Sequence, residues 1–97
     1  MSTIDLRPRT LYMIFQNGCA ACAEAEPHFD AAAKERPLLL ALKLSADGPH
    51  VARLPIKVKA TPTWVYRVGD QAALREGSMT KDEILKWVDA VEAQLSR

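Results

Sequence analysis

The chain has 97 residues, of which 48% are hydrophobic and 26% are charged, and its formal net charge is +1. This length suits one domain, and the composition is that of an ordinary globular protein rather than a disordered one. The balance of charge argues against a nucleic-acid-binding protein, because no domain-wide basic excess is present to contact a phosphate backbone.

The first predicted element is a strand over residues 10–15. This segment is apolar, β-branched or aromatic throughout, which predicts a strand buried on both faces. A turn at Asn17 and Gly18 ends it. Residues 1–9 are predicted to form a loose arm, because Pro8 fits poorly at the start of a central strand. We therefore divide the chain into an arm, 1–9, and a domain, 10–97.

A helix is predicted next, over residues 20–35, because alanine and other helix formers dominate there until Arg36-Pro37. Pro27 lies within this stretch and lacks a backbone donor, so we expect a kinked helix or two short helices that meet there. Residues 37–44 are apolar and bounded by turn residues, which predicts a buried strand. A short strand–helix–strand connection implies that these two strands are parallel.

The second half is predicted to contain a short helix within residues 49–58 and a hairpin of strands 63–68 and 71–75, joined by a Gly69-Asp70 turn. Thr80 and Glu83 have the spacing of a capping box, which predicts the start of a final helix. Its apolar residues recur at helical spacing and are predicted to face the core. They are Ile84, Leu85, Trp87, Val88, Val91 and Leu95.

Cys19 and Cys22 are the only cysteines, and two alanines separate them. Two cysteines cannot form the disulfide framework of a small secreted domain. They could be small buried hydrophobic residues, or half of a zinc site with His28 and His50, whose spacing is unusual for such a site. We favour a third interpretation, in which the two thiols form a dithiol that cycles with a disulfide.

The position of the cysteines supports a redox role. Cys19 falls where the first strand meets the first helix, and unpaired backbone N–H groups and a partial positive charge stabilise a thiolate at a helix N-terminus. The pKa of Cys19 should therefore lie below the value of about 8.5 for a free thiol, whereas that of the inward-facing Cys22 should be higher. We expect Cys19 to attack a substrate disulfide and Cys22 to resolve the mixed disulfide.

These features resemble the thioredoxin-like family. The resemblance rests on the Cys-x-x-Cys pair after a first strand, on Pro27 five residues past Cys22, and on Thr61-Pro62-Thr63 at the start of a later strand. It covers about residues 10–96. It implies a minimal α/β fold, with a four-stranded mixed sheet and helices on both faces.

The resemblance also implies a substrate-binding surface. Thr61-Pro62 would be a cis peptide in a loop that lies against the dithiol, and the backbone before the proline would pair with an extended substrate. Gly18 and Ala60 would contribute to the same surface. The implied partners are a disulfide-containing substrate, protein or small molecule, and an external reductant or reductase, with no cofactor and no metal.

The sequence departs from the thioredoxin pattern at several positions. Gly18 stands where thioredoxins usually carry tryptophan, and Met13 stands where they bury an acid that serves the second cysteine. The proton of Cys22 must then pass to another group or to water, and Glu24 is a weak candidate. Lys43 falls near a family lysine, and we expect it at the surface because an unpaired buried lysine would be costly.

In length the chain resembles the glutaredoxins, which also lack the N-terminal strand and helix of thioredoxins. It does not have their Thr-Val-Pro or Gly-Gly motifs, so no preference for glutathione is expected. Arg53, Lys57 and Lys59 could still meet a carboxylate, although a solvated basic face is the more common arrangement.

We therefore expect a monomeric thiol–disulfide oxidoreductase. The longest apolar stretch, residues 38–42, is too short to span a bilayer, and residues 1–5 lack the features of a signal peptide, so we expect a cytoplasmic protein without a membrane partner. One alternative is a binding or adaptor module with the same fold and a minor or sensory redox role. Another is a zinc ion or iron–sulfur cluster held between the cysteine pairs of two chains.

Overall fold

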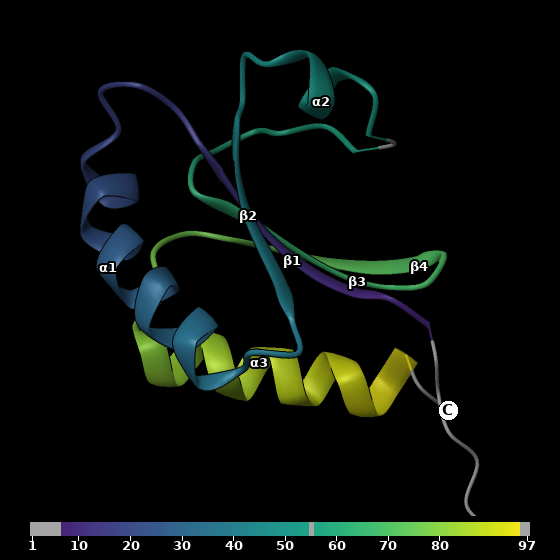
Figure 1. The fold of residues 1–97 in the computed structure, drawn as a ribbon. Helices are drawn as coiled ribbons and strands as arrows, with labels where there is room; N and C mark the ends of the chain where they lie inside the picture. The colour runs from purple at the N-terminus through teal and green to yellow at the C-terminus, as the bar shows by residue number, and fades with distance from the viewer. Residues whose placement is uncertain (1–6, 55, 96–97) are drawn as a thin grey trace, which may run out of the picture.

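The computed structural model describes residues 7–54 and 56–95. In this part of the chain strands and helices alternate up to β3, and the β3–β4 hairpin and a last helix follow (Figure 1). No helix among these residues is long and apolar enough to cross a bilayer. The elements are β1 (Arg9–Phe15), α1 (Ala20–Glu35), β2 (Leu40–Ser45), α2 (Pro49–Ala52), β3 (Thr63–Val68), β4 (Gln71–Glu76) and α3 (Lys81–Leu95).

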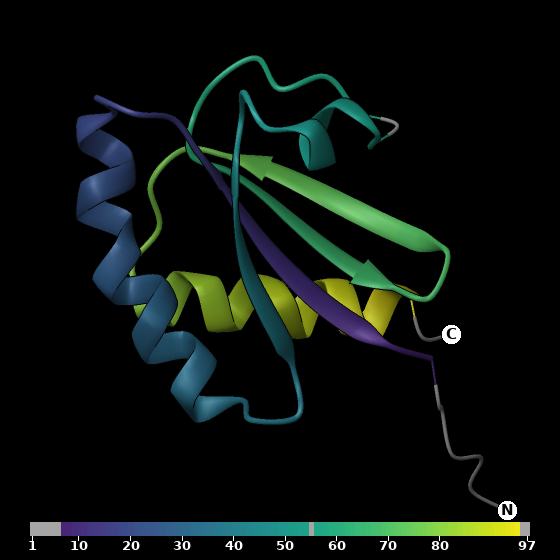
Figure 2. The same ribbon diagram turned by 45° about the horizontal axis from the view of Figure 1, so that its top comes forward.

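The four strands form one mixed sheet in the order β2-β1-β3-β4 (Figure 2). β1 pairs in parallel with β2 and antiparallel with β3, and β3 pairs antiparallel with β4. The parallel pair follows from the α1 crossover, and the β3–β4 hairpin turns at Gly69, whose φ of +61° suits glycine. The predicted four-stranded mixed sheet is confirmed.

The two long helices, α1 and α3, pack against each other and against one face of the sheet. Pro27 lies inside a single helix that continues from residue 20 to residue 35, so the alternative of two short helices is wrong. The predicted apolar stripe of α3 faces this core. The buried core between helices and sheet contains, among others, Leu11, Met13, Phe29, Trp64, Tyr66, Met79 and Ile84.

The opposite face of the sheet is covered much less. The four-residue helix α2 and the segment after it pack there on a smaller cluster centred on Ile14, Val51 and Val65. The burial predicted for the second strand is wrong, because Leu40 in β2 is 57% exposed and the preceding Leu38 is 99% exposed. β2 is an edge strand, and α2 is too short to cover its outer half.

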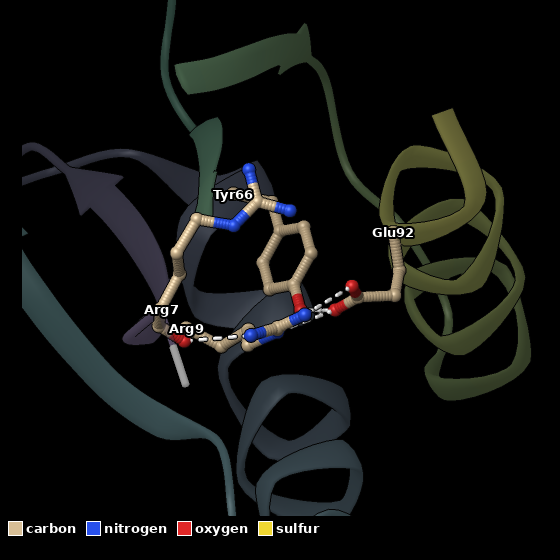
Figure 3. A network of polar contacts seen from close by, with 4 residues as sticks. All are labelled: Arg7, Arg9, Tyr66 and Glu92. Atoms are coloured by element: carbon tan, nitrogen blue, oxygen red, sulfur yellow. Dashed lines mark hydrogen bonds and ion pairs between the residues drawn. The ribbon is translucent and has the colours of Figure 1, made fainter. Parts of the chain in front are cut away.

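At the start of β1, a polar network fastens the sheet to α3 (Figure 3). Arg9 donates two hydrogen bonds to the carboxylate of Glu92, from Nε at 3.0 Å and from Nη2 at 2.8 Å. The hydroxyl of Tyr66 donates to the same carboxylate at 2.8 Å. Arg9 is thus part of the central strand, which begins one residue earlier than predicted, and residues 1–6 of the predicted arm lie outside the described residues.

The start of α3 is capped as predicted. The backbone N–H of Glu83 donates to Oγ1 of Thr80 at 3.3 Å, and the backbone N–H of Thr80 donates to Oε1 of Glu83 at 3.0 Å. These reciprocal bonds satisfy groups that the first turn of a helix leaves unpaired. They fix the point at which the chain leaves the sheet and begins its last helix.

Candidate active site

Cys19 lies at the junction of sheet and helix, as the sequence predicts. It is the N-cap residue of α1, with extended backbone angles, and its carbonyl accepts a hydrogen bond from the N–H of Ala23 at 3.1 Å. The backbone N–H of Cys22 donates to Cys19 Sγ at 3.1 Å. A sulfur atom thus occupies the position that a serine or aspartate oxygen takes at many helix N-termini.

The turn before Cys19 favours the glycine at position 18. Gly18 has a φ of +79°, a left-handed conformation that residues with a side chain rarely adopt. The turn is closed by the N–H of Cys19, which donates to the carbonyl of Gln16 at 3.2 Å. A β-carbon at position 18 would meet no atom within 4 Å, so the backbone angle rather than crowding favours glycine there.

Cys19 and Cys22 are joined by a disulfide, with 5.2 Å between their Cα atoms. This separation lies within the usual range for disulfides. Cys22 is 5% exposed and belongs to the main core, whereas Cys19 is half-buried at the edge of that core. A molecule from solvent therefore reaches Cys19 before Cys22.

The loop before β3 faces the disulfide. The carbonyl oxygen of Thr61 lies 3.5 Å from Cys19 Sγ, and the peptide between Thr61 and Pro62 is cis, as the family resemblance implies. Pro62 is buried, while Ala60 is exposed beside it. Of the residues expected to contact substrate, Thr61 therefore lies at the disulfide through its carbonyl, and the buried Pro62 follows it along the chain. Ala60 and Gly18 are both exposed, and they directly precede Thr61 and Cys19 in the sequence.

A second loop holds the proline loop in place. The N–H of Gly77 donates to the carbonyl of Pro62 at 2.9 Å, and the carbonyl of Gly77 accepts from Nε1 of Trp64 at 2.7 Å. Gly77 has a φ of +99°, which again suits glycine. The contact between Trp64 and Gly77 could not be predicted from the sequence, because no local pattern links a strand residue to a loop thirteen residues away.

Among the described residues, no carboxylate is buried in the core that contains Cys22, since the buried polar residues are Thr10 and Thr63. Met13 is fully buried there, and Glu24, the predicted weak candidate, is exposed. Residues two positions apart on a helix do not face each other, so Glu24 points away from the sulfur of Cys22. A direct proton transfer from Cys22 to Glu24 is therefore not supported.

Lys43 is partly exposed and is paired, so the prediction of a surface position holds. Its Nζ lies 3.0 Å from Oδ1 of Asp30 and 3.7 Å from Oε2 of Glu26, both on α1. The same nitrogen lies 5.8 Å from the centre of the Phe29 ring, within the distance of a cation–π contact. These contacts tie Lys43 to α1.

The two histidines have separate surroundings. Nδ1 of His28 accepts a hydrogen bond from the backbone N–H of Lys81 at 3.1 Å, and this bond links α1 to the start of α3. His50 lies in α2, in the thinner layer on the other face of the sheet. Within the described ranges, no three residues of the types that bind metals are grouped closely enough to hold an ion.

Comparison of the whole fold with solved structures finds thioredoxins. Chloroplastic thioredoxin z has a TM-score of 0.75 and 20% identity, covering 91% of this chain and 81% of that chain. Fasciola hepatica thioredoxin has a TM-score of 0.74 and 21% identity, covering 86% of this chain and 80% of that chain. Mitochondrial thioredoxin 3 of Saccharomyces cerevisiae, in its oxidised form, has a TM-score of 0.75 and 19% identity, covering 89% of this chain and 81% of that chain.

No family model and no curated protein sequence matches the chain. The structural likeness, at about one residue identical in five, establishes the fold: this chain has the thioredoxin fold. A Cys-x-x-Cys disulfide at the N-terminus of α1 in this fold supports a thiol–disulfide oxidoreductase role in general.

Proposed function

We propose that this protein reduces disulfide bonds in other proteins, with Cys19 as the nucleophile and Cys22 as the resolving thiol. The observation that carries the proposal is the position of Cys19 Sγ, which accepts a backbone hydrogen bond at the start of α1 and lies 3.5 Å from the Thr61 carbonyl. The same N–H of Cys22 would stabilise a thiolate at Cys19 in the reduced protein, because a negative charge is favoured at a helix N-terminus.

The proposed reaction has two exchange steps. The Cys19 thiolate attacks one sulfur of the substrate disulfide, forms a mixed disulfide, and releases the other substrate sulfur as a thiolate. The Cys22 thiolate then attacks Cys19 Sγ, closes the Cys19–Cys22 disulfide and releases the second substrate sulfur. Two electrons pass from the dithiol to the substrate, and the two protons of the dithiol end on the substrate thiols.

Substrate binding is assigned to the exposed surface around the disulfide. The backbone of Thr61 faces Cys19 and could pair with an extended substrate segment, as an added strand pairs with a sheet edge. A disulfide held there would have one sulfur next to Cys19 while Cys22 stays in the core. An external dithiol protein or small thiol would return the protein to its reduced form.

The proposal is tested with Cys22→Ser. This variant should form a mixed disulfide with a disulfide-bonded protein such as insulin and should not release it, because the resolving sulfur is missing. Mass spectrometry under non-reducing conditions detects the adduct. Cys19→Ser should form no such adduct and should lose insulin reduction. Full insulin reduction by both variants would overturn the mechanism.

A binding or adaptor role is the main alternative, and the observation that favours it is that the described core around Cys22 buries no carboxylate. Equilibration of the protein with glutathione buffers separates the two functions. A reduction potential between about −270 and −180 mV is the range of thioredoxin and protein disulfide isomerase and supports catalysis. A potential far outside it supports a structural or sensory disulfide.

A further inference from the structure

A basic groove lies next to the proline loop. It has a volume of about 230 Å³ and opens on the face of the sheet that carries α2. Its floor includes Thr63, the first residue of β3, which pairs with Glu76 at the end of β4. The lining residues are Lys57, Lys59, Thr63, Leu74, Arg75 and Glu76.

The groove is close to the reacting sulfur. Thr61 contacts Cys19 Sγ through its carbonyl oxygen, and Thr63 follows two residues later along the chain. Two extended residues span at most about 7 Å. The groove therefore lies within the span of two or three extended residues from a substrate cysteine bonded to Cys19.

Three cations and one carboxylate line this groove, so its charge is positive although the whole chain carries only +1. Lys57, Lys59 and Arg75 are all exposed and can turn toward a bound group. Leu74, which is 45% exposed, adds an apolar wall to the groove. Such a groove attracts negatively charged groups and raises the rate at which they encounter the site.

We infer that the preferred substrate of the dithiol is a disulfide-bonded polypeptide with aspartate or glutamate within two or three residues of the cysteine that Cys19 attacks. This inference rests on the proposed function and adds its substrate class. Lys57 and Lys59 meet the acidic side chain, while the backbone of Thr61 pairs with the substrate segment.

The test uses three short peptides that differ only in charge. Each contains one cysteine joined by a disulfide to thionitrobenzoate, and the residues flanking the cysteine are glutamate, glutamine or lysine. The reduced protein attacks the peptide sulfur and releases the yellow thionitrobenzoate anion, which is the better leaving group. Each second-order rate is divided by the rate of the same peptide with dithiothreitol, so that intrinsic differences between peptides cancel.

The wild-type protein should react about tenfold faster with the glutamate peptide than with the lysine peptide at low salt, the effect of a few exposed charge contacts. The preference should decline as the salt concentration rises. Lys57→Glu/Lys59→Glu should remove or reverse it. Arg75 is left unchanged in this variant because its charge also acts on Glu83.

Lys34→Glu/Lys86→Glu is the matched control, since it changes the net charge by the same amount. Lys34 lies about 22 Å along α1 from Cys19, and Lys86 lies on α3, which packs on the other face of the sheet. This variant should keep the wild-type preference. An equal loss of the glutamate preference in both double variants, or equal rates for all three peptides, would contradict the proposed role of the groove in substrate selection. If the reduced wild-type protein reacts with none of the peptides, the proposed function is wrong, and the proposed role of the groove is wrong as well.

Discussion

The indole Nε1 of Trp64 donates a 2.7 Å hydrogen bond to the carbonyl of Gly77, and this bond connects the core of the sheet to the loop that supports the active site. Trp64 is fully buried. Gly77 in turn donates its N–H to the carbonyl of Pro62, next to the residue that faces Cys19. The buried indole and the proline loop are therefore coupled through one glycine.

Trp64→Phe is expected to lower the free energy of unfolding by at least about 1–2 kcal/mol, because it leaves the Gly77 carbonyl without its donor and removes buried volume. Urea unfolding followed by circular dichroism measures this change. Trp87→Phe is the matched control, since Trp87 is only half-buried on α3. Equal losses in the two variants would contradict a special role for the Trp64 bond.

Gly18→Ala is expected to cost about 1 kcal/mol of stability, because alanine is strained at a φ of +79°. No atom would crowd the new β-carbon, so the cost is one of backbone conformation alone. Gly18→Asn should cost less, since asparagine tolerates left-handed angles better than alanine does. Denaturant midpoints of the three proteins check this order, and a wild-type midpoint for Gly18→Ala would contradict it.

Tyr66 is expected to make stability sensitive to alkaline pH. Burial raises the pKa of Tyr66 well above its ordinary value of 10, and its hydrogen bond to Glu92 raises it further. The folded state therefore holds this proton more tightly than the unfolded state does. The resulting stability is complete below pH 10 and is lost progressively as the pH rises above 10.

The stability of Tyr66→Phe should accordingly decline less at alkaline pH than that of the wild type. At neutral pH the variant should be less stable by about 1 kcal/mol, because it lacks the hydrogen bond of the hydroxyl. Urea unfolding at pH 7 and at several values above pH 10 measures both effects. Tyr12 packs against the smaller cluster on the opposite face of the sheet, so Tyr12→Phe leaves the contact between Tyr66 and Glu92 intact and should retain the wild-type decline. Parallel pH profiles for wild type and Tyr66→Phe would show that the buried hydroxyl is not responsible.

The ion pair between Arg36 and Asp89 is expected to contribute a small, acid-sensitive stabilisation. Arg36 donates to both carboxylate oxygens, at 2.6 and 3.0 Å, and these hydrogen bonds hold the pKa of Asp89 below its ordinary value of 3.8. The contribution is therefore present above pH 3.8 and is lost as the pH falls through the lower folded-state pKa. Because both side chains are exposed to solvent, it should not exceed about 1 kcal/mol.

A double-mutant cycle with Arg36→Gln and Asp89→Asn isolates this contribution. The coupling between the two substitutions should be measurable at pH 7 and should decline as the pH falls below 3.8 and the carboxylate becomes protonated. High salt should also reduce it, since exposed charges are screened. A coupling energy that does not change with pH would exclude an electrostatic origin.

Much of the fold could be predicted because its signals are local. The capping box at Thr80 and Glu83, the glycine turn at Gly69 and the apolar run of β1 each depend on neighbours within a few residues, and all appear in the structure. The Cys19–Cys22 pair is also a local signal, because the two cysteines are only three residues apart. The cis peptide at Thr61-Pro62 was expected only through the family resemblance.

The remaining features depend on contacts between distant segments. The apolar residues of β2 predicted a buried strand, yet the strand order places β2 at an edge, and a helix of four residues cannot cover it. The same long-range arrangement joins Trp64 to Gly77 and brings Lys57 and Arg75 to one groove.

The sequence by itself determined which segments become strands and helices and where the two thiols sit, because these choices follow from local backbone energetics and from apolar periodicity. Only the tertiary structure decided which sulfur is exposed to solvent, which strand lies at an uncovered edge of the sheet, and which cationic side chains lie beside the proline loop. These properties depend on how elements far apart in the chain pack in space, and no pattern within one segment encodes that packing.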